Sequence, residues 1–369
     1  MNICVERDLW EYLAGTDKTV VMYGMGNGAD KILGECASRG IEVADFFASD
    51  GFVRGQVFHG KTVLSWSAVK EKYGVSNLIV LLSFGTSRPE VLEVIERIAR
   101  EAELYAPDVP AFGDGLFDRP FFEAHRAELA RVWALLSDEE SRRIFENVIR
   151  FKLTGRIEYL ADAESDPEEI LSEQIRPTEI TAAADLGAYN GDTVRALLEH
   201  AGGSVKRVWA MEPDLRNHRK LQAYAEGEDR AEVIAVHAGA WSCEETLFFD
   251  ASGNRNASFG SNRSEALSNR PAKMTEIRAL PLDAVLNGAR VDYIKYDVEG
   301  SEREALIGSS ETLGKWSPRL LVSLYHRNED LFDLPLLVRE RFPAYRRFYL
   351  RRLRGVPAWD LDLFCVASD

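Results

Sequence analysis

The chain has 369 residues, and its 60 acidic side chains outnumber the 45 Lys and Arg side chains, which gives a formal net charge of −15 at pH 7. Domains usually contain about 100–200 residues, so this length predicts two of them. The negative charge excludes binding to nucleic acid through general attraction for phosphates.

The cysteines and the N-terminus predict a cellular compartment. Cys4, Cys36, Cys243 and Cys365 show no paired spacing, which argues against a disulfide framework or a thiolate zinc site and is typical of a reducing compartment. The first ten residues, MNICVERDLW, lack the apolar core of a signal peptide. No apolar run approaches the ~18 residues of a spanning helix. We therefore expect a cytoplasmic protein without a membrane span.

Strand and helix patterns alternate in the first part of the chain. Buried strands are predicted at 18–23, 41–48 and 75–84, and apolar residues at helical spacing predict a helix over 88–103. This alternation is typical of a parallel α/β sheet. We assign residues 1–115 to a Rossmann-like N-terminal domain.

A glycine-rich turn follows the first of these strands. GMGNGA has the spacing G-x-G-x-x-A between a strand and a helix, and an acid ends the next strand about 20 residues on, as in nucleotide sites. The candidate nucleotide-site residues are Gly24, Gly26, Asn27, Ala29 and Asp50. A single glycine motif is weak, and a domain that only packs or dimerises fits equally well.

Residues 116–176 show a different pattern. Apolar residues recur at helical spacing from 116 to 160, and Asp138 precedes an acidic first turn that suits a helix start. We predict two or three helices that bridge two domains. An acidic, Pro-containing loop at 162–169 places the boundary just before residue 177.

Strand–helix alternation resumes over residues 177–369. Strands are predicted at 181–188, 207–212, 232–237, 291–297, 319–325, 346–351 and 361–367. Only a loop separates the strands predicted at 346–351 and 361–367, so these two strands are expected to pair antiparallel. The fold class is therefore α/β, with two Rossmann-like domains joined by a helical segment and a seven-stranded C-terminal sheet whose last strand is antiparallel. Residues 242–280 are expected to form an irregular insertion with short strands.

The turn from Asp185 to Asp192 carries the strongest chemical signal. A strand runs into it, a helix follows it, and Gly187 and Gly191 allow the backbone to approach a ligand closely. The two flanking carboxylates would repel a pyrophosphate. S-adenosylmethionine has no phosphate, and its ammonium suits carboxylates while its carboxylate suits a helix N-terminus.

Glu212 ends the next strand, where an acid hydrogen-bonds ribose hydroxyls in nucleotide sites; a helix-capping turn is the alternative.

Titratable side chains also follow two later strands. Asp297 and Glu299 end one predicted strand and His326 ends the next, so all three are expected at the same sheet edge as the glycine turn. His326 would be the base that deprotonates a hydroxyl acceptor, because its reference pKa is near neutrality. A structural hydrogen bond is the alternative for His326. A divalent metal held by the three residues is a further, less favoured hypothesis.

Arginines are dense near the C-terminus. Arg346, Arg347, Arg351, Arg352 and Arg354 fall in and after one predicted strand. These side chains are interpreted either as solvent-exposed charges on a pair of strands or as a contact for an anionic acceptor.

The ordered motifs DLGAYNGDT, MEPD, VHAGAW, NASFGS, LPLD, IKYDVEGSEREAL and LYHRNED resemble the FkbM family of S-adenosylmethionine-dependent methyltransferases. The resemblance covers residues 178–330, and the helical segment before it resembles that of some bacterial members. It implies a methyltransferase sheet and O-methylation of a sugar or polyketide-like hydroxyl. It also implies that residues 256–261 face the acceptor, that Asp297 and Glu299 lie near the methyl group, and that His326 lies on the acceptor side. The cofactor residues that it implies, with those of the turn, are Asp185, Gly187, Ala188, Tyr189, Gly191, Asp192, Glu212, Gly239, Ala240 and Asp297.

Three functional hypotheses remain open from the sequence. The first is O-methylation of a small-molecule or glycan hydroxyl with S-adenosyl-L-methionine. The second is a nucleotide-sugar-binding protein or NAD-dependent oxidoreductase that uses the N-terminal domain, which resembles those of sugar-modifying enzymes. The third is a scaffold that keeps a cofactor pocket without turnover. A homo-oligomer is compatible with each of them.

Overall fold

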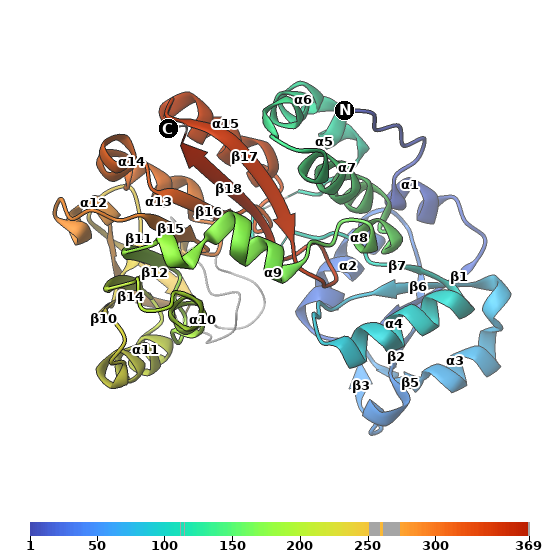
Figure 1. Ribbon diagram of the computed structural model, residues 1–369. Helices are drawn as coiled ribbons and strands as arrows, with labels where there is room; N and C mark the ends of the chain where they lie inside the picture. The colour runs from blue at the N-terminus through green and yellow to red at the C-terminus, as the bar shows by residue number, and fades with distance from the viewer. Residues whose placement is uncertain (111, 114, 251–258, 261–273, 368–369) are drawn as a thin grey trace.

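Two β-sheets, one from each half of the chain, are joined by a layer of helices in the computed structural model (Figure 1). The structure describes residues 1–110, 112–113, 115–250, 259–260 and 274–367. No helix within these ranges combines the length and the apolar character that a bilayer crossing needs.

The N-terminal sheet is parallel, with the strand order β5-β2-β1-β6-β7. Its strands are β1 (Thr19–Tyr23), β2 (Val43–Ala48), β5 (Leu64–Ser65), β6 (Leu78–Leu82) and β7 (Glu103–Tyr105), and a small hairpin, β3 (Val57–Phe58) and β4 (Lys61–Thr62), lies beside it. Its helices are α1 (Leu9–Ala14), α2 (Asn27–Ser38), α3 (Trp66–Tyr73) and α4 (Pro89–Glu101). Alternate residues along β1 face two different cores, so helices cover both faces of the sheet.

The predicted N-terminal strands are confirmed, but the helix predicted over 88–103 is too long. Helix α4 ends at Glu101, and residues 103–105 form the edge strand β7 beside β6. Leu104 is buried there, so pairing with the sheet outweighs continuation of the helix.

Helices dominate the chain between the two sheets. They are α5 (Arg119–Ala124), α6 (Arg126–Leu135), α7 (Glu139–Thr154), α8 (Glu158–Ala161) and α9 (Pro167–Glu169), followed by a π-helical turn at Ile170–Ile175. Asp138 caps α7 by accepting a hydrogen bond from the Ser141 N–H. The apolar face of α7 belongs to a core cluster that includes strand residues of both sheets. The helical segment thus packs against both halves of the protein.

The C-terminal sheet has seven strands in the order β10-β9-β8-β15-β16-β18-β17. They are β8 (Ala182–Leu186), β9 (Arg207–Met211), β10 (Glu232–Val236), β15 (Tyr293–Tyr296), β16 (Arg319–Ser323), β17 (Tyr345–Arg352) and β18 (Leu361–Ala367). The first five are mutually parallel, and β18 runs antiparallel to both of its neighbours. The predicted seven-stranded sheet is therefore confirmed.

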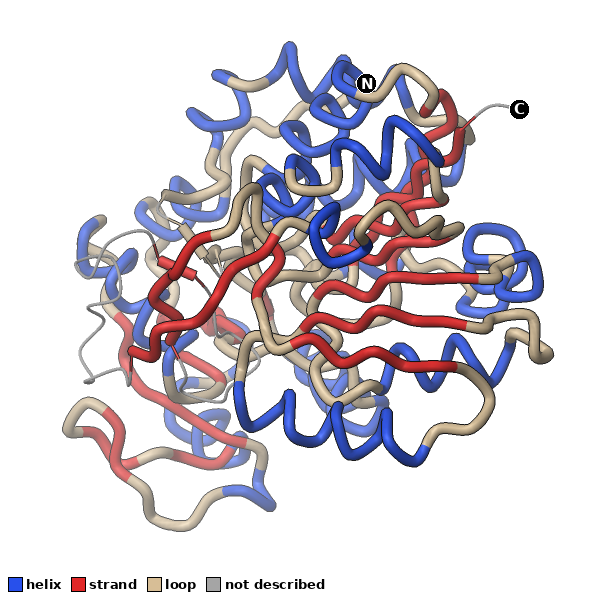
Figure 2. The backbone as a smooth tube through the Cα atoms, turned by 90° about the vertical axis from the view of Figure 1, so that its left-hand side faces the viewer, coloured by secondary structure: helices blue, strands red, loops and turns tan. Residues whose placement is uncertain are grey.

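Helices cover both faces of this sheet, as Figure 2 shows. Helices α10 (Asp192–His200) and α11 (Leu215–Gly227) pack on one face. The other face receives α13 (Glu302–Ile307), α14 (Ser310–Trp316) and α15 (Asp330–Arg341), and a short α12 (Leu282–Leu286) lies near them. The carboxyl ends of β8, β9, β15 and β16 consequently meet at one open edge.

Four short strands follow β10: β11 (Gly239–Ala240), β12 (Glu245–Asp250), β13 (Phe259–Gly260) and β14 (Met274–Leu280). The segment predicted to face the acceptor, residues 256–261, lies outside the described residues except for the backbone of 259–260.

The C-terminal arginines do not form one solvated patch. Arg352 is fully buried and donates hydrogen bonds to the Leu160 and Gly355 carbonyls. Arg351 is also buried, and its Nη2 lies 2.7 Å from Asp138 Oδ2 and 3.2 Å from Glu140 Oε2. Both side chains therefore connect the edge strand β17 to the helical segment, and neither is presented to an acceptor.

Replacing Arg351 with Met should lower the free energy of unfolding by about 2–4 kcal/mol, because Asp138 and Glu140 would lose their buried cation. Although burial opposes the effect, the Arg351 guanidinium and Ser141 lower the pKa of Asp138. The loss should therefore be complete above the ordinary pKa of an Asp and should disappear as the pH falls through the lowered pKa. Denaturant unfolding across that pH range measures it. Arg347→Met, at an exposed position of the same strand, is the control, and equal losses in both variants would contradict the assignment.

Candidate active site

The turn after β8 lies against the end of β15. Gly187 has φ +88°, and a Cβ there would come within 1.9 Å of the Asp297 carbonyl oxygen. Gly191 has φ +85°, and a Cβ there would come within 2.5 Å of the Tyr224 ring. Only glycine allows these two approaches, so both glycines shape the turn by packing as well as by conformation.

Glu212 connects this turn to the end of β9. Its carboxylate accepts hydrogen bonds from the Tyr189 N–H at 2.9 Å and from the Asp214 N–H at 2.8 Å. Burial raises the pKa of Glu212 to about 8, against the opposing effect of these backbone donors. A buried carboxyl with further acceptor capacity therefore lies on one side of the site.

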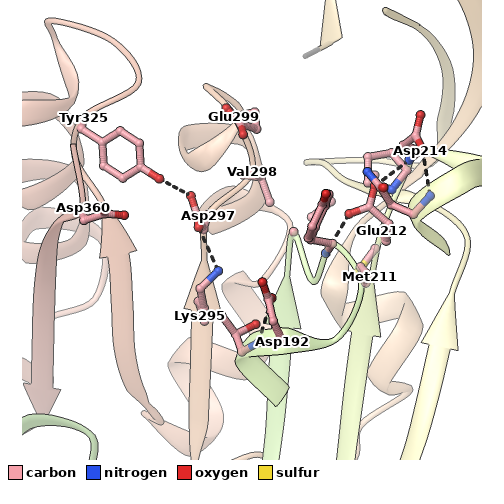
Figure 3. Close-up of a pocket in the computed structure, with 17 residues that line it drawn as sticks. Asp192, Met211, Glu212, Asp214, Lys295, Asp297, Val298, Glu299, Tyr325 and Asp360 are labelled. Atoms are coloured by element: carbon pink, nitrogen blue, oxygen red, sulfur yellow. Dashed lines mark hydrogen bonds and ion pairs between the residues drawn. The ribbon is translucent and has the colours of Figure 1, made fainter. Parts of the chain in front are cut away.

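A buried ammonium lies on the other side. Lys295 Nζ is 3.0 Å from Asp297 Oδ2 and 3.6 Å from Asp185 Oδ1. Although burial favours the neutral amine, these two carboxylates raise the pKa of Lys295 above its ordinary value. Lys295, His326 and Tyr325 in turn hold the pKa of Asp297 at about 2 despite its burial. Tyr325 donates a hydrogen bond of 3.0 Å to Asp297 Oδ1, and Figure 3 shows these three side chains in a row.

Asp185, on β8, is the third member of this charged group. Its Oδ2 accepts a hydrogen bond from the Thr193 hydroxyl, and its buried Oδ1 has no hydrogen-bond partner among the described residues. Burial raises the pKa of Asp185, against the effect of Lys295. An acceptor atom without a donor is thus available beside the cavity.

His326 contacts Asp297 and is 1% exposed. Its Nδ1 is 2.8 Å from Glu302 Oε1, and its Nε2 lies 3.3 Å from Glu299 Oε2 and 3.6 Å from Asp297 Oδ1. Burial favours the neutral ring, but the surrounding carboxylates, Glu302 foremost, raise the pKa of His326 well above its ordinary value. These carboxylates therefore favour the protonated form of the imidazole.

Glu212, Lys295, Asp297 and Tyr325 border a cavity of about 270 Å³ at the open edge of the sheet. Figure 3 shows Glu212 and Asp214 across it from Asp297 and Tyr325. Of the predicted cofactor residues, seven line the cavity: Gly187, Tyr189, Asp192, Glu212, Gly239, Ala240 and Asp297. Asp185, Ala188 and Gly191 do not line it; Ala188 is fully buried, and the other two support the turn.

Sequence reasoning missed several lining residues. They are Lys295, Tyr325, Asp214, Asn217 and Asp360, none of which the sequence pattern assigns to the site. The position of Tyr325 beside His326 at a strand end was a usable signal. Asp360 had none, because it reaches the site from the loop between β17 and β18.

The catalytic candidates are brought together, but not as a metal site. Glu299 lines the cavity beside Asp297, and His326 contacts both. Within the described ranges, no group of three His, Cys, Asp or Glu side chains has an arrangement that could hold a metal ion.

The N-terminal glycine motif is used differently from its prediction. A cavity of about 190 Å³ lies beside α2, and among the five candidates only Asn27 lines it. A Cβ on Gly24 would meet Ser83 and Phe84 at 2.6 Å, and Ala29 is fully buried, so both serve packing. Gly26, with φ +98°, precedes the helix.

Asp50 is not brought to this cavity. The chain turns away after β2 into a 3₁₀ turn at Asp50–Phe52, where Asp50 accepts a hydrogen bond of 2.9 Å from the Ser67 hydroxyl. The strand-end acid of the motif is thus hydrogen-bonded to the start of α3.

Comparison with known proteins agrees with this architecture. Residues 185–352 match the Methyltransferase FkbM domain family. The crystal structure of methyltransferase FkbM from Methylobacillus flagellatus KT is similar over 94% of this chain and 90% of its own, with 20% sequence identity and a TM-score of 0.70.

More distant matches include a methyltransferase from Geobacter sulfurreducens, with 12% identity over 77% of this chain and 91% of its own and a TM-score of 0.30. Aeropyrum pernix fibrillarin with bound S-adenosyl-L-methionine matches 50% of this chain and 66% of its own, with 10% identity and a TM-score of 0.32. No curated protein matches the chain.

Gly187→Ala should remove cofactor-site binding of S-adenosylhomocysteine and lower the free energy of unfolding by about 3 kcal/mol or more, because the new Cβ overlaps the Asp297 carbonyl. Calorimetric titration and denaturant unfolding measure the two effects. Gly203→Ala is the matched control: its φ is +82°, nothing lies within 4 Å of the added Cβ, and it should cost about 1 kcal/mol. Equal losses would show that conformational strain alone, and not contact with β15, explains the need for Gly187.

Proposed function

We propose that this protein transfers a methyl group from S-adenosyl-L-methionine to a hydroxyl oxygen of a sugar, a glycan or a related small molecule. The match of residues 185–352 to the Methyltransferase FkbM domain family supports this proposal. The observation that carries the proposal is the cavity at the sheet edge, with Glu212 on one side and, on the other, the Lys295–Asp297 ion pair that Asp185 contacts. This geometry suits a ligand with an ammonium at one end and a ribose at the other.

Charge complementarity supports the cofactor assignment. Lys295 lies between two carboxylates, Asp185 and Asp297, so this group has a net charge of −1 when all three are ionised. S-adenosylmethionine carries a sulfonium, an ammonium and a carboxylate, which give a net charge of +1. A pyrophosphate would meet repulsion from the same carboxylates.

We assign the parts of the cofactor as follows. Asp185 would accept from the ammonium, and Lys295 with the first turn of α10 would hold the carboxylate. Glu212 would accept from the ribose hydroxyls, and residues 239–240 would border the adenine. When bound, S-adenosylmethionine supplies an electrophilic methyl group on sulfur and leaves as a thioether.

The protein itself would align the reacting atoms and supply a group that accepts the hydroxyl proton. Methyl transfer to oxygen forms one C–O bond as one C–S bond breaks, and alignment of the three atoms lowers the barrier. The acceptor hydroxyl must also lose its proton. The carboxylates around His326 favour its protonated form, so we assign that step to Glu299, whose pKa is raised by burial.

In this arrangement His326 is a positioning residue. Its Nδ1 is fixed by Glu302, and its Nε2 faces the carboxylates of Glu299 and Asp297. The imidazolium would keep both carboxylates turned toward the cavity. His326 as the base stays the alternative, favoured if the sulfonium of the bound cofactor lowers the pKa of the ring.

Asp185→Asn should weaken binding of S-adenosylhomocysteine by about 10–100-fold, since a hydrogen bond to a charged group contributes about 1.5–3 kcal/mol. Glu212→Gln should weaken it by up to about 10-fold, since burial raises the pKa of Glu212 to about 8 and a hydrogen bond to a neutral group contributes about 0.5–1.5 kcal/mol. Isothermal titration calorimetry measures the affinity. Glu226→Gln, an exposed residue of α11, is the control and should leave it unchanged. Unchanged affinity in both site variants would disprove the cofactor assignment.

Glu299→Gln should lower methyl transfer by about 10²–10⁴-fold while leaving S-adenosylhomocysteine affinity intact, because a general base contributes that much to rate. Transfer from radiolabelled S-adenosylmethionine to a panel of neutral sugars, amino sugars and nucleotide sugars measures it. His326→Gln keeps a hydrogen-bonding group at that position and should retain part of the rate. The opposite ranking of the two variants would make His326 the base.

A further inference from the structure

A third cavity, of about 140 Å³, lies where the two halves of the protein meet. Residues 85–87, which follow β6, form one wall, and the loop between β17 and β18 forms another. Glu299, Tyr325 and Asp360 line both this junction cavity and the cavity assigned to the cofactor. The two cavities therefore meet at the carboxylate to which we assign the proton transfer.

Backbone hydrogen bonds fix the N-terminal wall in place. The Thr86 N–H donates to the Val356 carbonyl at 2.7 Å, and the Val356 N–H donates to the Thr86 carbonyl at 3.0 Å. Gly85 lies flush against the Trp359 indole, since a Cβ on Gly85 would come within 2.2 Å of that ring. Segments about 270 residues apart in sequence thus form one surface.

The lining has two kinds of chemistry. Trp359 is 39% exposed, which leaves part of a large aromatic ring open to contact. The other kind of chemistry comes from the Glu299 carboxylate and from His326 Nε2, which lies 3.3 Å from Glu299 Oε2. An aromatic face together with hydrogen-bonding groups matches a sugar ring, which has an apolar C–H face and hydroxyls at its rim.

The carboxylates around the junction cavity limit the class of sugar that it can bind. Glu299 and Asp360 line the junction cavity, and Asp297 lies 3.6 Å from His326 Nε2. A phosphate or sulfate would be placed among these carboxylates and repelled. Hydroxyl and ammonium groups would instead find acceptors.

We propose that the junction cavity is the acceptor site and that it takes an uncharged or amine-bearing sugar ring, held between Trp359 and the Glu299–His326 pair. The N-terminal half would then act as a wall of the acceptor site, in place of an independent nucleotide site. The inference rests on the proposed methyl transfer, because the ring must lie next to the cofactor cavity.

The test uses the full chain saturated with S-adenosylhomocysteine. Saturation-transfer NMR is recorded with methyl β-glucopyranoside, glucosamine, glucose 6-phosphate and UDP-glucose. The first two should bind and the two phosphates should not. Trp359→Ala should weaken sugar binding by about tenfold, the size expected for loss of an aromatic contact, with S-adenosylhomocysteine affinity unchanged. Trp316→Ala, a half-buried tryptophan on α14, is the control and should have no effect.

A second variant tests the N-terminal wall and does not remove the indole. Ser87 is exposed and lines only the junction cavity of the two, so Ser87→Trp should block the sugar and spare S-adenosylhomocysteine. Binding of the phosphates in preference to the neutral sugars would overturn the inference, as would sugar binding unaffected by both variants or absent from wild type. Each of these results leaves cofactor binding standing. Failure of wild type to bind S-adenosylhomocysteine would instead overturn the proposed function, and this inference with it.

Discussion

The site depends on one buried ammonium. Lys295 pairs directly across the sheet with Asp185, and Asp297 follows two residues later on the same strand. Without the cation, two carboxylates would share a buried space and repel each other, which costs several kcal/mol. With it, the ends of β8 and β15 can stay close enough for Gly187 to touch the Asp297 carbonyl. The position of the glycine turn, and so the shape of the cavity, follows from this group.

The parallel sheets and the location of the site could be predicted from the sequence. Strand–helix alternation reports the fold because its signal is local, and acids at strand ends must gather at one edge of a parallel sheet. This reasoning brought Asp297, Glu299 and His326 to the same place as the turn at Asp185, and the structure places them there. The same reasoning failed for Asp50, because it assumed that the chain continues straight past its strand.

Long-range partners could not be predicted. Glu302 looks like an ordinary first-turn residue of a helix, yet it fixes His326 and helps to keep the ring protonated. Arg351 and Arg352 look like surface charges in a polar strand, yet they are buried against helices more than 190 residues earlier in the chain. In each case the environment is created by packing between distant segments, and no periodic pattern within a window of sequence reports it.

The pairing of Thr86 with Val356 has a consequence for how such a protein can diversify. Each of the two hydrogen bonds uses backbone atoms only, so the pairing is indifferent to the side chains of the loop that follows β6. Residues 85–87 touch the junction cavity but not the cavity beside the glycine turn. Thr86 and Ser87 could therefore change in sequence while the chemistry of the other cavity stays constant, whereas Gly85 is restricted by the Trp359 ring. Acceptor selectivity would then be shared between the two halves of the polypeptide, and reactivity would belong to the C-terminal half alone.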